Sequence, residues 1–492
     1  MRSLPASIHF MKIHTYILLS LISAASLVAG EPSAMPTYHF TSPTGKNCMP
    51  FDPNGAVFHK GRYHLGYIYQ EHGKHFWGHA STTDLIHWQM QPPMLSPGPE
   101  EGIFSGNAFV DKKGRVVLSY HGLGLGGNCL AVAQDDDLNV FKKLEANPVM
   151  KNPGWDPHTW VEDGTYYAIS GGSPGSGQPA FLYTSADDEL AKWTLLGPLM
   201  KHEMPDVFAN EDISCPDLFK LGNKHILLCI SHARGARYYI GRFIKNQFVA
   251  ESHHRMNWPG GGCFAPETLL DGKGRRIMWA WVLGEPSTMT LPRVLSLADD
   301  GVLQIEPAEE LNALRQNKQS LKDIAVTAGK NVPAEGIKGD CKELQITMDP
   351  QQSPQCGVKV RCSPDFMEET VVTYDSVRKV LRVDVEKSSL NKKRLPKTFA
   401  MDFMIPKGVR NPVLTAQEAP LALRDGEKLE LRIYLDHSIL EVYANGRQCI
   451  TQRIWPTLDD SMGVSFFSLG SDAKVLSFDA WDMSPVTMSP LK

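Results

Sequence analysis

The stretch VFHKGRYHLGYIY, from Val57 to Tyr69, contains two apolar runs joined by a polar turn that has Gly61 at its centre. β-Branched and aromatic residues favour strands, and glycine readily adopts the positive φ angle that a tight turn needs. The stretch therefore predicts a β-hairpin. Four further stretches follow the same pattern: AFVDKKGRVVLSY (108–120), TWVEDGTYYAIS (159–170), LFKLGNKHILLCIS (218–231) and TLLDGKGRRIMWAWV (268–282). Their turn glycines recur every 50 to 58 residues, which is an internal repeat.

A second regularity lies just upstream of each hairpin. Strand-rich repeats of about 40 to 50 residues are typical of β-propeller blades, which surround a central axis. We therefore predict a five-bladed β-propeller. A short motif precedes each hairpin, where the innermost strand of each blade should run: FDPNG (51–55), FSGN (104–107), WDPH (155–158), SCPD (214–217) and FAPE (264–267). Equivalent positions of five blades face one axis, so the carboxylates in these motifs should converge on one funnel.

The blades also contain outer hairpins of a common shape. WGHASTTDLIHW (77–88) and SADDELAKW (185–193) each place a tryptophan after a polar turn. Aromatic residues in such positions usually pack between neighbouring sheets. We predict that Trp88 and Trp193 belong to the core.

The C-terminal part of the chain predicts a second domain of a different kind. At 492 residues the chain is too long for one ordinary core. PAEELNALRQ (307–316) has the spacing of a short helix, and strand patterns follow it, most clearly LRIYLDHSILEVYANG (431–446) with its Asn445-Gly446 turn. Several short antiparallel strands indicate a β-sandwich. The predicted chain is all-β: a propeller at 31–305, a linker with a short helix at 306–334 and a sandwich at 335–492.

Residues 1–30 have the composition of a signal peptide. Lys12 precedes an apolar stretch that ends in the small residues Val28-Ala29-Gly30. A single membrane anchor is the alternative, although the stretch is short for a span and is interrupted by polar residues. No other segment has the hydrophobicity to cross a bilayer. The leader predicts a secreted or periplasmic protein that leaves the membrane after cleavage.

Composition narrows the partners and cofactors. The formal net charge is −4 and there is no block of basic residues, so nucleic acid is not expected as a partner. None of the nine cysteines has the C-x₂-C spacing of a metal site, and we expect neither a metal nor a cofactor. Cys341, Cys356 and Cys362 cluster in the C-terminal part, where export would permit a disulfide. The sequence does not indicate an oligomeric state.

The predicted funnel contains the residue types that cleave glycosidic bonds. Hydrolysis with retention needs two carboxyl groups about 5 to 5.5 Å apart, one to attack the anomeric carbon and one to protonate the leaving oxygen. Asp52 precedes Pro53-Asn54-Gly55, a turn sequence that would fix the carboxylate at a strand end. Asp156 also precedes a proline. An Asp-Pro pair alone indicates only a turn, but the prolines here mark equivalent positions of a repeat.

Several of these motifs together resemble family 32 of the glycoside hydrolases, the β-fructofuranosidases that include invertases, levanases and inulinases. The resemblance spans about 48 to 470 and rests on MPFDPNG (49–55), WGHASTTDLIHW (77–88), FSG (104–106), WDP (155–157), CPDLF (215–219), FAPETLLDGKGRRIMWAW (264–281) and LRIYLDHSILEVYANG (431–446). It implies a five-bladed propeller followed by a β-sandwich, in agreement with the prediction from the repeats.

The resemblance also implies roles for individual residues. Asp52 falls on the nucleophile, which would form a covalent glycosyl-enzyme intermediate. Asp156 falls on the stabiliser of the transition state. Five other residues fall on positions that line the sugar subsite: Gln70, Trp77, Phe104, Ser105 and Trp281. The aromatic residues among them could instead pack blades together.

Three departures from the family pattern concern the same site. Phe51 stands where the family usually has asparagine, and Trp155 stands where it has arginine. Ser214 stands where the family has the acid/base glutamate, and a serine hydroxyl cannot act as a general acid near neutral pH. Losing asparagine and arginine removes polar sugar ligands.

Other carboxyl groups could replace the missing glutamate. Alternate residues of a strand share a face, so Asp212 should point the same way as Ser214 and Glu211 the opposite way. Asp212 is the favoured acid/base candidate, Glu267 and Glu211 are its rivals, and the absence of any acid is a further alternative.

These features favour one function over two others. The first hypothesis is a secreted retaining glycosidase that cleaves a fructofuranoside or related furanoside in an oligo- or polysaccharide. A second is a catalytically impaired, sugar-binding propeller, for which Ser214 is the best argument. A protein-binding platform is a third reading, which an acid-lined funnel does not favour.

Overall fold

The computed structural model describes residues 35–43, 46–151, 154–172, 179–201, 204–401, 405 and 408–491. The predicted signal peptide lies outside these residues. The described chain is built almost entirely of antiparallel strands, with two short 3₁₀ helices, η2 (Glu309–Leu314) and η3 (Lys392–Arg394). None of these helices has the length and hydrophobicity to span a membrane.

Residues 53 to 307 form five separate sheets of four or five strands. The first sheet contains β1 (Pro53–His59), β2 (Arg62–Glu71), β3 (Lys74–Thr82) and β4 (His87–Leu95), with β35 (Thr487–Ser489) parallel to β4. The second contains β5 (Gly102–Val110), β6 (Val116–Leu123), β7 (Gly127–Ala133), β8 (Phe141–Lys143) and β9 (Met150–Lys151). The third contains β10 (Trp155–Glu162), β11 (Thr165–Gly171), β12 (Phe181–Ser185) and β13 (Thr194–Pro198). The fourth contains β14 (Ser214–Leu221), β15 (Lys224–Ser231), β16 (Gly235–Ile244) and β17 (Gln247–Arg255). The fifth contains β18 (Cys263–Leu270), β19 (Arg276–Val282), β20 (Thr288–Met289), β21 (Arg293–Leu297) and β22 (Leu303–Pro307).

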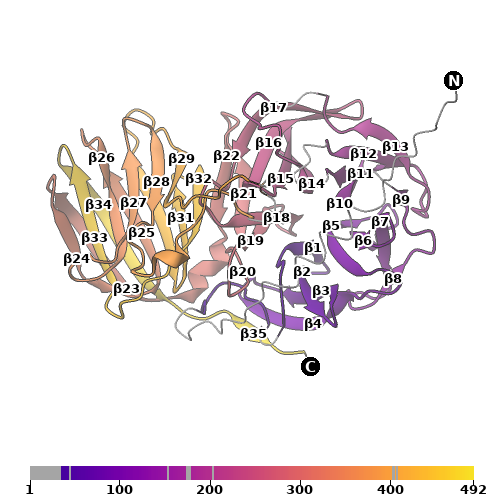
Figure 1. Ribbon diagram of the computed structural model, residues 1–492, viewed down its shortest axis with the longest axis horizontal. Coiled ribbons are helices and arrows are strands. Elements are labelled where there is room, and N and C mark those ends of the chain that lie inside the picture. The colour runs from indigo at the N-terminus through magenta and orange to yellow at the C-terminus, as the bar shows by residue number, and fades with distance from the viewer. Residues whose placement is uncertain are drawn as a thin grey trace, which may run out of the picture.

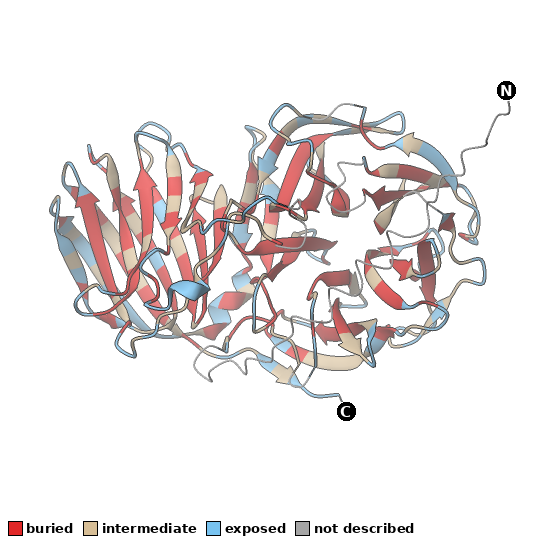
Figure 2. Ribbon diagram, in the orientation of Figure 1, coloured by how far each residue is buried: buried red, intermediate tan, exposed pale blue. Residues whose placement is uncertain are grey.

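The five sheets close into a ring through their first strands. In order around the ring, β1 contacts β5, β5 contacts β10, β10 contacts β14, β14 contacts β18, and β18 contacts β1 (Figure 1). These inner strands are mostly buried (Figure 2). The hairpin that follows each inner strand turns at a glycine with positive φ, as the sequence predicted: Gly61, Gly114, Gly164, Gly222 and Gly274. The predicted repeat is therefore the structural repeat.

Every inner strand is irregular at the same place. In four sheets the register between the inner strand and the second strand shifts within the four-residue motif of the inner strand. In the first sheet the shift comes slightly later, between Asn54 and Val57 of β1. Asp156, Cys215 and Ala265, the second motif residues of three sheets, have φ angles of 37°, 43° and 44°. Such backbone is unfavourable for residues other than glycine and is often found at functional sites. A β-bulge also re-aims a side chain, here at the centre of the ring.

The C-terminal part consists of two six-stranded sheets. One contains β23 (Arg315–Val326), β34 (Ala473–Met483), β25 (Cys341–Asp349), β30 (Leu429–Asp436), β31 (Ile439–Ala444) and β32 (Gln448–Arg453). The other contains β24 (Asn331–Lys338), β33 (Gly463–Leu469), β26 (Gln355–Cys362), β27 (Thr370–Asp375), β28 (Val380–Asp384) and β29 (Ala416–Pro420). Both contribute to a single apolar core. This is a β-sandwich, beside the ring in Figure 1.

The segment predicted as a linker differs from the prediction. Helix η2 is present, with Leu311 and Leu314 buried, but β23 and β24 occupy most of the residues between it and 334. β23 is an edge strand, and most of its side chains are exposed. An exposed edge strand needs no apolar alternation, so its sequence is indistinguishable from a polar linker.

Two smaller predictions have mixed outcomes. Trp88 is buried and Trp193 is half-buried, and each indole donates to the carbonyl three residues earlier, of Leu85 (3.1 Å) and Leu190 (2.9 Å). The two outer turns are therefore equivalent. All nine cysteines are free thiols, so the C-terminal cysteines form no disulfide.

Candidate active site

Asp52 lies immediately before β1, in the second position of its motif, and is 7% exposed. Ser105, the equivalent residue of the next sheet, donates a hydrogen bond of 2.8 Å to Asp52 Oδ2. Oδ1 is buried and has no hydrogen-bond partner among the described residues. Burial raises the pKa of Asp52 to about 7, and the nearby Asp156 adds to the rise. The carboxylate thus has one anchored oxygen and one free oxygen.

Asp156 occupies the same position two sheets further on and is also buried. The backbone N–H of Cys215, again the equivalent residue of the next sheet, donates to Asp156 Oδ2 at 3.1 Å, and the Cys215 thiol lies 3.5 Å from the same oxygen. Burial raises the pKa of Asp156 to about 6, while the charge of His232 opposes the rise. The repeat therefore brings both predicted carboxylates to one centre and places Ser105 on the sheet between them.

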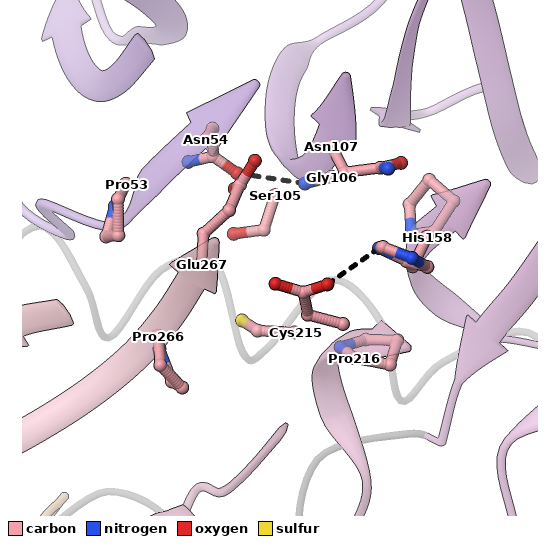
Figure 3. A pocket seen from close by; sticks show the side chains of 12 residues that line it. Pro53, Asn54, Ser105, Gly106, Asn107, His158, Cys215, Pro216, Pro266 and Glu267 are labelled. Carbon is pink, nitrogen blue, oxygen red and sulfur yellow. Dashed lines mark hydrogen bonds and ion pairs between the residues drawn. The ribbon is translucent and has the colours of Figure 1, made fainter. Parts of the chain in front are cut away.

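A second tier of polar residues lies two positions along each inner strand, around a narrow axial pocket (Figure 3). Each of these side chains contacts the backbone of the next inner strand. Five contacts complete the ring: Asn54 Oδ1 accepts from Gly106 N (2.9 Å), Asn107 Oδ1 accepts from Thr159 N (2.8 Å), His158 Nε2 lies 3.1 Å from Leu218 O, Asp217 Oδ2 accepts from Thr268 N (2.8 Å), and Glu267 Oε1 accepts from Ala56 N (2.8 Å).

This ring gives Glu267 a structural role. Its hydrogen bond is one of the contacts between the last sheet and the first, as is the hydrogen bond from the Tyr63 hydroxyl to Asp271 at 3.1 Å. Burial raises the pKa of Glu267 well above its ordinary value. The second tier thus closes the ring, and the first tier carries Asp52 and Asp156.

Asp212 and Ser214 share a side, as the strand alternation predicted. The Ser214 hydroxyl donates to Asp212 Oδ2 at 2.8 Å. The same oxygen is 2.7 Å from Nδ1 of His232, whose backbone N–H donates to Asp212 Oδ1 at 3.1 Å. Burial alone would raise the pKa of Asp212, but the hydrogen bond and charge of His232 lower it below the usual value. The Asp212 side chain has no exposed surface.

Glu211 points the other way, into a cluster of arginines. Its carboxylate is 2.7 Å from Arg255, 3.0 Å from Arg234 and 3.0 Å from Arg237, and its side chain is fully buried. The three guanidinium groups occupy both carboxylate oxygens. This arrangement does not suit a proton donor.

The residues predicted to line a sugar subsite have different surroundings. Ser105 reaches the centre, and Phe104 is half-buried against His75, with ring centroids 4.4 Å apart. Gln70 is half-buried and tied to Met49 O at 2.6 Å. Trp77 is fully buried, and its indole donates to the Phe104 carbonyl, so it packs the first two sheets together. Trp281 is 1% exposed, yet its indole N–H has no partner among the described residues.

The two other departures make the site more aromatic. Phe51 is fully buried and stacks on Phe40, with centroids 6.2 Å apart. Trp155 is half-buried and stacks on His121 at 4.0 Å, and it also contacts Phe104 at 5.8 Å. Phe51 has thus become part of the core, whereas Trp155 and Phe104 form an aromatic wall beside the carboxylates.

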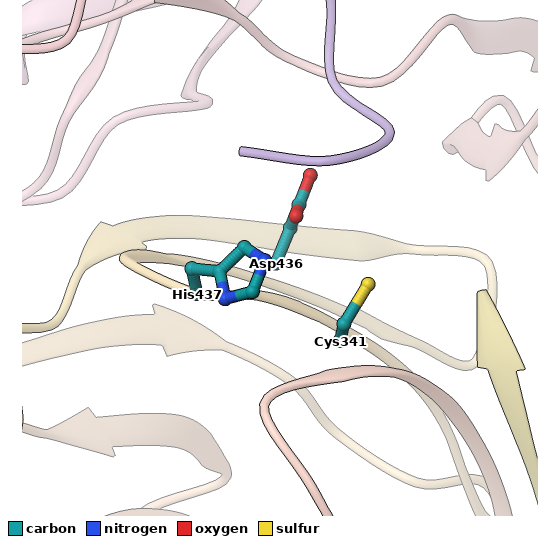
Figure 4. A group of neighbouring side chains, drawn as sticks. All are labelled: Cys341, Asp436 and His437. Carbon is teal, nitrogen blue, oxygen red and sulfur yellow. The ribbon is translucent and has the colours of Figure 1, made fainter. Parts of the chain in front are cut away.

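One other cluster in the described residues has the composition of a metal site: Cys341, Asp436 and His437 (Figure 4). Its polar atoms already have partners. Asp436 accepts hydrogen bonds from the backbone N–H groups of Thr37, Tyr38 and His39, at 2.6 to 3.0 Å. Both ring nitrogens of His437 are engaged, one by Thr37 (2.8 Å) and one by Asp340 (2.9 Å). The Asp-His pair of the C-terminal motif therefore fastens the N-terminal segment to the sandwich.

His232 is the site residue that the sequence prediction missed. His232 lies just after β15, and Asp212 lies just before β14. The two residues are neighbours because Ser214 of β14 pairs with Ile230 of β15. Counting residues outward from the Gly222 turn would place Ala233 there instead, since the bulge at Cys215 shifts the register by one. The five repeated motifs were the signal in the sequence that could have indicated such a register shift.

A ring of sheets with paired buried carboxylates at its centre, joined to a β-sandwich, defines a glycosidase of the β-fructofuranosidase type. The family models agree. Residues 39–307 match the glycosyl hydrolases family 32 N-terminal domain, and residues 310–482 match the family's C-terminal domain. The chain therefore belongs to glycosyl hydrolase family 32.

The chain is similar to individual fructan-hydrolysing enzymes along most of its length. It is 28% identical to a fructan 6-exohydrolase of Beta vulgaris, covering 91% of this chain and 86% of the relative. It is 29% identical to a levanase of Bacillus subtilis, covering 93% of this chain and 70% of the relative. The crystal structure of fructan 1-exohydrolase IIa from Cichorium intybus superposes with a TM-score of 0.79 at 22% identity, covering 94% of this chain and 100% of that one.

Proposed function

We propose that the protein is an exported, retaining glycosidase that cleaves β-fructofuranosides or closely related furanosides. In this proposal each of the five sheets is one blade of a propeller, and the substrate enters the funnel at its centre. Family membership supports the reaction class, and the names of the reported relatives, fructan 6-exohydrolase and levanase, point to fructans as substrates.

The observation that carries the proposal is the state of Asp52. A buried carboxylate with a raised pKa and one free oxygen suits a nucleophile, because desolvation makes the free oxygen reactive. Asp156, held by the Cys215 backbone, would stabilise positive charge on the sugar ring. Asp212, with its hydrogen-bonded partner His232, would supply the proton. The sugar subsite would be shaped by Ser105, Phe104, Gln70, Trp77 and Trp281.

The direct test is a screen with product analysis. The purified protein is incubated with sucrose, inulin, levan and arabinofuranosides, and the anomer released first is followed by NMR. We expect the product to have the anomeric configuration of its substrate, which is β for sucrose, inulin and levan, because two displacements at one carbon restore the configuration. A product of inverted configuration would contradict the retaining mechanism.

A non-catalytic, sugar-binding propeller is the second candidate, and Ser214 favours it because a glutamate is missing there. It predicts that calorimetry detects binding of at least one of these sugars while the screen detects no cleavage. Asp52 and Asp156 would then act only as hydrogen-bond acceptors.

A further inference from the structure

Asp212 and His232 form a hydrogen-bonded pair near the carboxylates of Asp52 and Asp156. The two residues come from opposite ends of one hairpin, before β14 and after β15. Asp212 holds His232 through two contacts, to its backbone N–H and to its Nδ1. The Ser214 hydroxyl supports the same carboxylate oxygen. The imidazole orientation is therefore fixed.

The remaining ring nitrogen of His232 is free. Nε2 has no hydrogen bond among the described residues and is not among their buried unpartnered atoms, and the side chain is 16% exposed. The ring packs against Phe264 of β18, with centroids 5.9 Å apart. The charges facing it are Asp212, Asp156 and Asp52. A free nitrogen thus lies close enough to both funnel carboxylates to interact with their charge.

Resting on the proposed function, we propose that His232 is the acid/base residue of this glycosidase and that Asp212 is its positioning residue. In the first step Asp52 attacks the anomeric carbon, the bond to the leaving oxygen breaks, and that oxygen takes the proton from His232 Nε2. In the second step Nε2 takes a proton from water, the hydroxyl attacks the anomeric carbon, and the ester bond to Asp52 breaks. The catalyst ends as it began.

The other candidate acids are less suited to this double task. Arginines clamp Glu211, and Asp212 has a lowered pKa and no exposed surface. Glu267 is engaged by the Ala56 backbone in the ring, and burial raises its pKa, which disfavours the ionised form that a base needs. Burial opposes the charge on His232, but the hydrogen bond and charge of Asp212 raise its pKa above the usual value. With Nδ1 held by Asp212, the imidazole can give and take a proton at Nε2.

The test compares His232→Gln, Asp212→Asn and the control His253→Gln. His253 also pairs with an aspartate, Asp206 at 2.8 Å, in the same sheet. The substrates are the best glycoside from the screen and an activated nitrophenyl β-fructofuranoside. We expect His232→Gln to lose on the order of 10³-fold in kcat/KM on the natural-type glycoside. Formation of the Asp52 ester from the activated substrate should change less than about tenfold, because that leaving group needs no proton.

Two further readouts separate catalysis from folding. Azide should restore turnover of the ester in His232→Gln and yield a glycosyl azide, since azide needs no general base. The basic limb of the pH profile should disappear in His232→Gln and move to lower pH in Asp212→Asn. The His232 pKa, measured by NMR of ¹⁵N-histidine, should fall in the same Asp212→Asn variant.

Three outcomes would overturn the assignment. The first is an equal loss of activity on both substrates in His232→Gln. The second is a pH profile of His232→Gln whose basic limb is unchanged. The third is a difference between the two substrates that is as large in His253→Gln as in His232→Gln. A wild type that cleaves nothing and forms no ester would overturn the proposed function, and the role of His232 with it. Activity in the wild type with any of the three outcomes would overturn only the role of His232.

Discussion

Two buried acids, Asp52 in the funnel and Glu441 at the junction of the two domains, have opposite pKa shifts. Glu441 on β31 is 3.0 Å from Arg293, accepts from the Leu291 backbone at 3.0 Å and from the Tyr443 hydroxyl at 2.7 Å. Burial would raise the pKa of Glu441, but Arg293, His39 at 3.4 Å and Tyr443 lower it to about 2. Asp52 has one hydrogen bond, and its pKa rises to about 7.

The number of partners around each carboxylate decides whether it contributes to stability or to reactivity. A buried carboxylate with all its partners stabilises the ionised, folded state, whereas one with a missing partner destabilises it and keeps a reactive oxygen. Sites of chemistry are commonly built in the second way. The following substitutions test whether that contrast holds in this protein.

The largest effect is expected at the domain junction. Glu441→Gln would leave the fully buried Arg293 guanidinium without its counter-charge, which should cost about 3–5 kcal/mol of unfolding free energy. Because the folded pKa of Glu441 lies below the unfolded value, the wild type should lose this contribution as the pH falls from about 4 to about 2. Urea denaturation at several pH values measures both. An unchanged midpoint at pH 7 would contradict the role of Glu441.

The next effect is on the reaction and not on the fold. Asp156→Asn should lower kcat by about 10²- to 10³-fold, because the neutral amide stabilises less positive charge in the transition state. The thermal midpoint should not fall, since the amide oxygen can still accept from Cys215. Steady-state kinetics and calorimetry on one preparation decide this. An unfolded variant would favour a purely structural turn at Asp156.

A smaller effect of opposite sign is expected for the stability of Asp52→Asn. Burial raises the folded pKa of Asp52 from 3.8 to about 7, so ionisation reduces wild-type stability as the pH rises through this range. The variant should gain about 2–4 kcal/mol over wild type at pH 8 and almost nothing near pH 4. Denaturant titrations at the two pH values provide the comparison. A loss of stability at pH 8 would make Asp52 a structural residue.

The smallest effect is expected at Glu267. Glu267→Gln keeps an oxygen that can accept from the Ala56 backbone, so kcat should change less than about threefold. Glu267→Ala leaves the buried Ala56 N–H without its acceptor between the last sheet and the first, and should cost about 1–3 kcal/mol of stability. A loss of 10²-fold or more in kcat for the glutamine variant would make Glu267 the proton donor instead.

The sequence predicted the parts of the molecule that repeat. Apolar alternation around Gly61 and the four equivalent glycines located the hairpins, and the motifs located Asp52 and Asp156. It did not reveal the exposed strand β23, because an edge strand without apolar alternation reads as a linker. It did not reveal His232, because a bulge at Cys215 changes which residues are opposite each other. Local patterns specify elements, whereas cross-strand partners depend on register.

Mass spectrometry can detect whether the free oxygen of Asp52 forms a covalent bond with the sugar. The wild type and Asp52→Asn are incubated with a mechanism-based furanosyl inhibitor, digested and compared. We expect one added glycosyl group on the peptide that contains Asp52 in the wild type and none in the variant. An unmodified wild type that still binds the inhibitor, or a label on another residue, would contradict it.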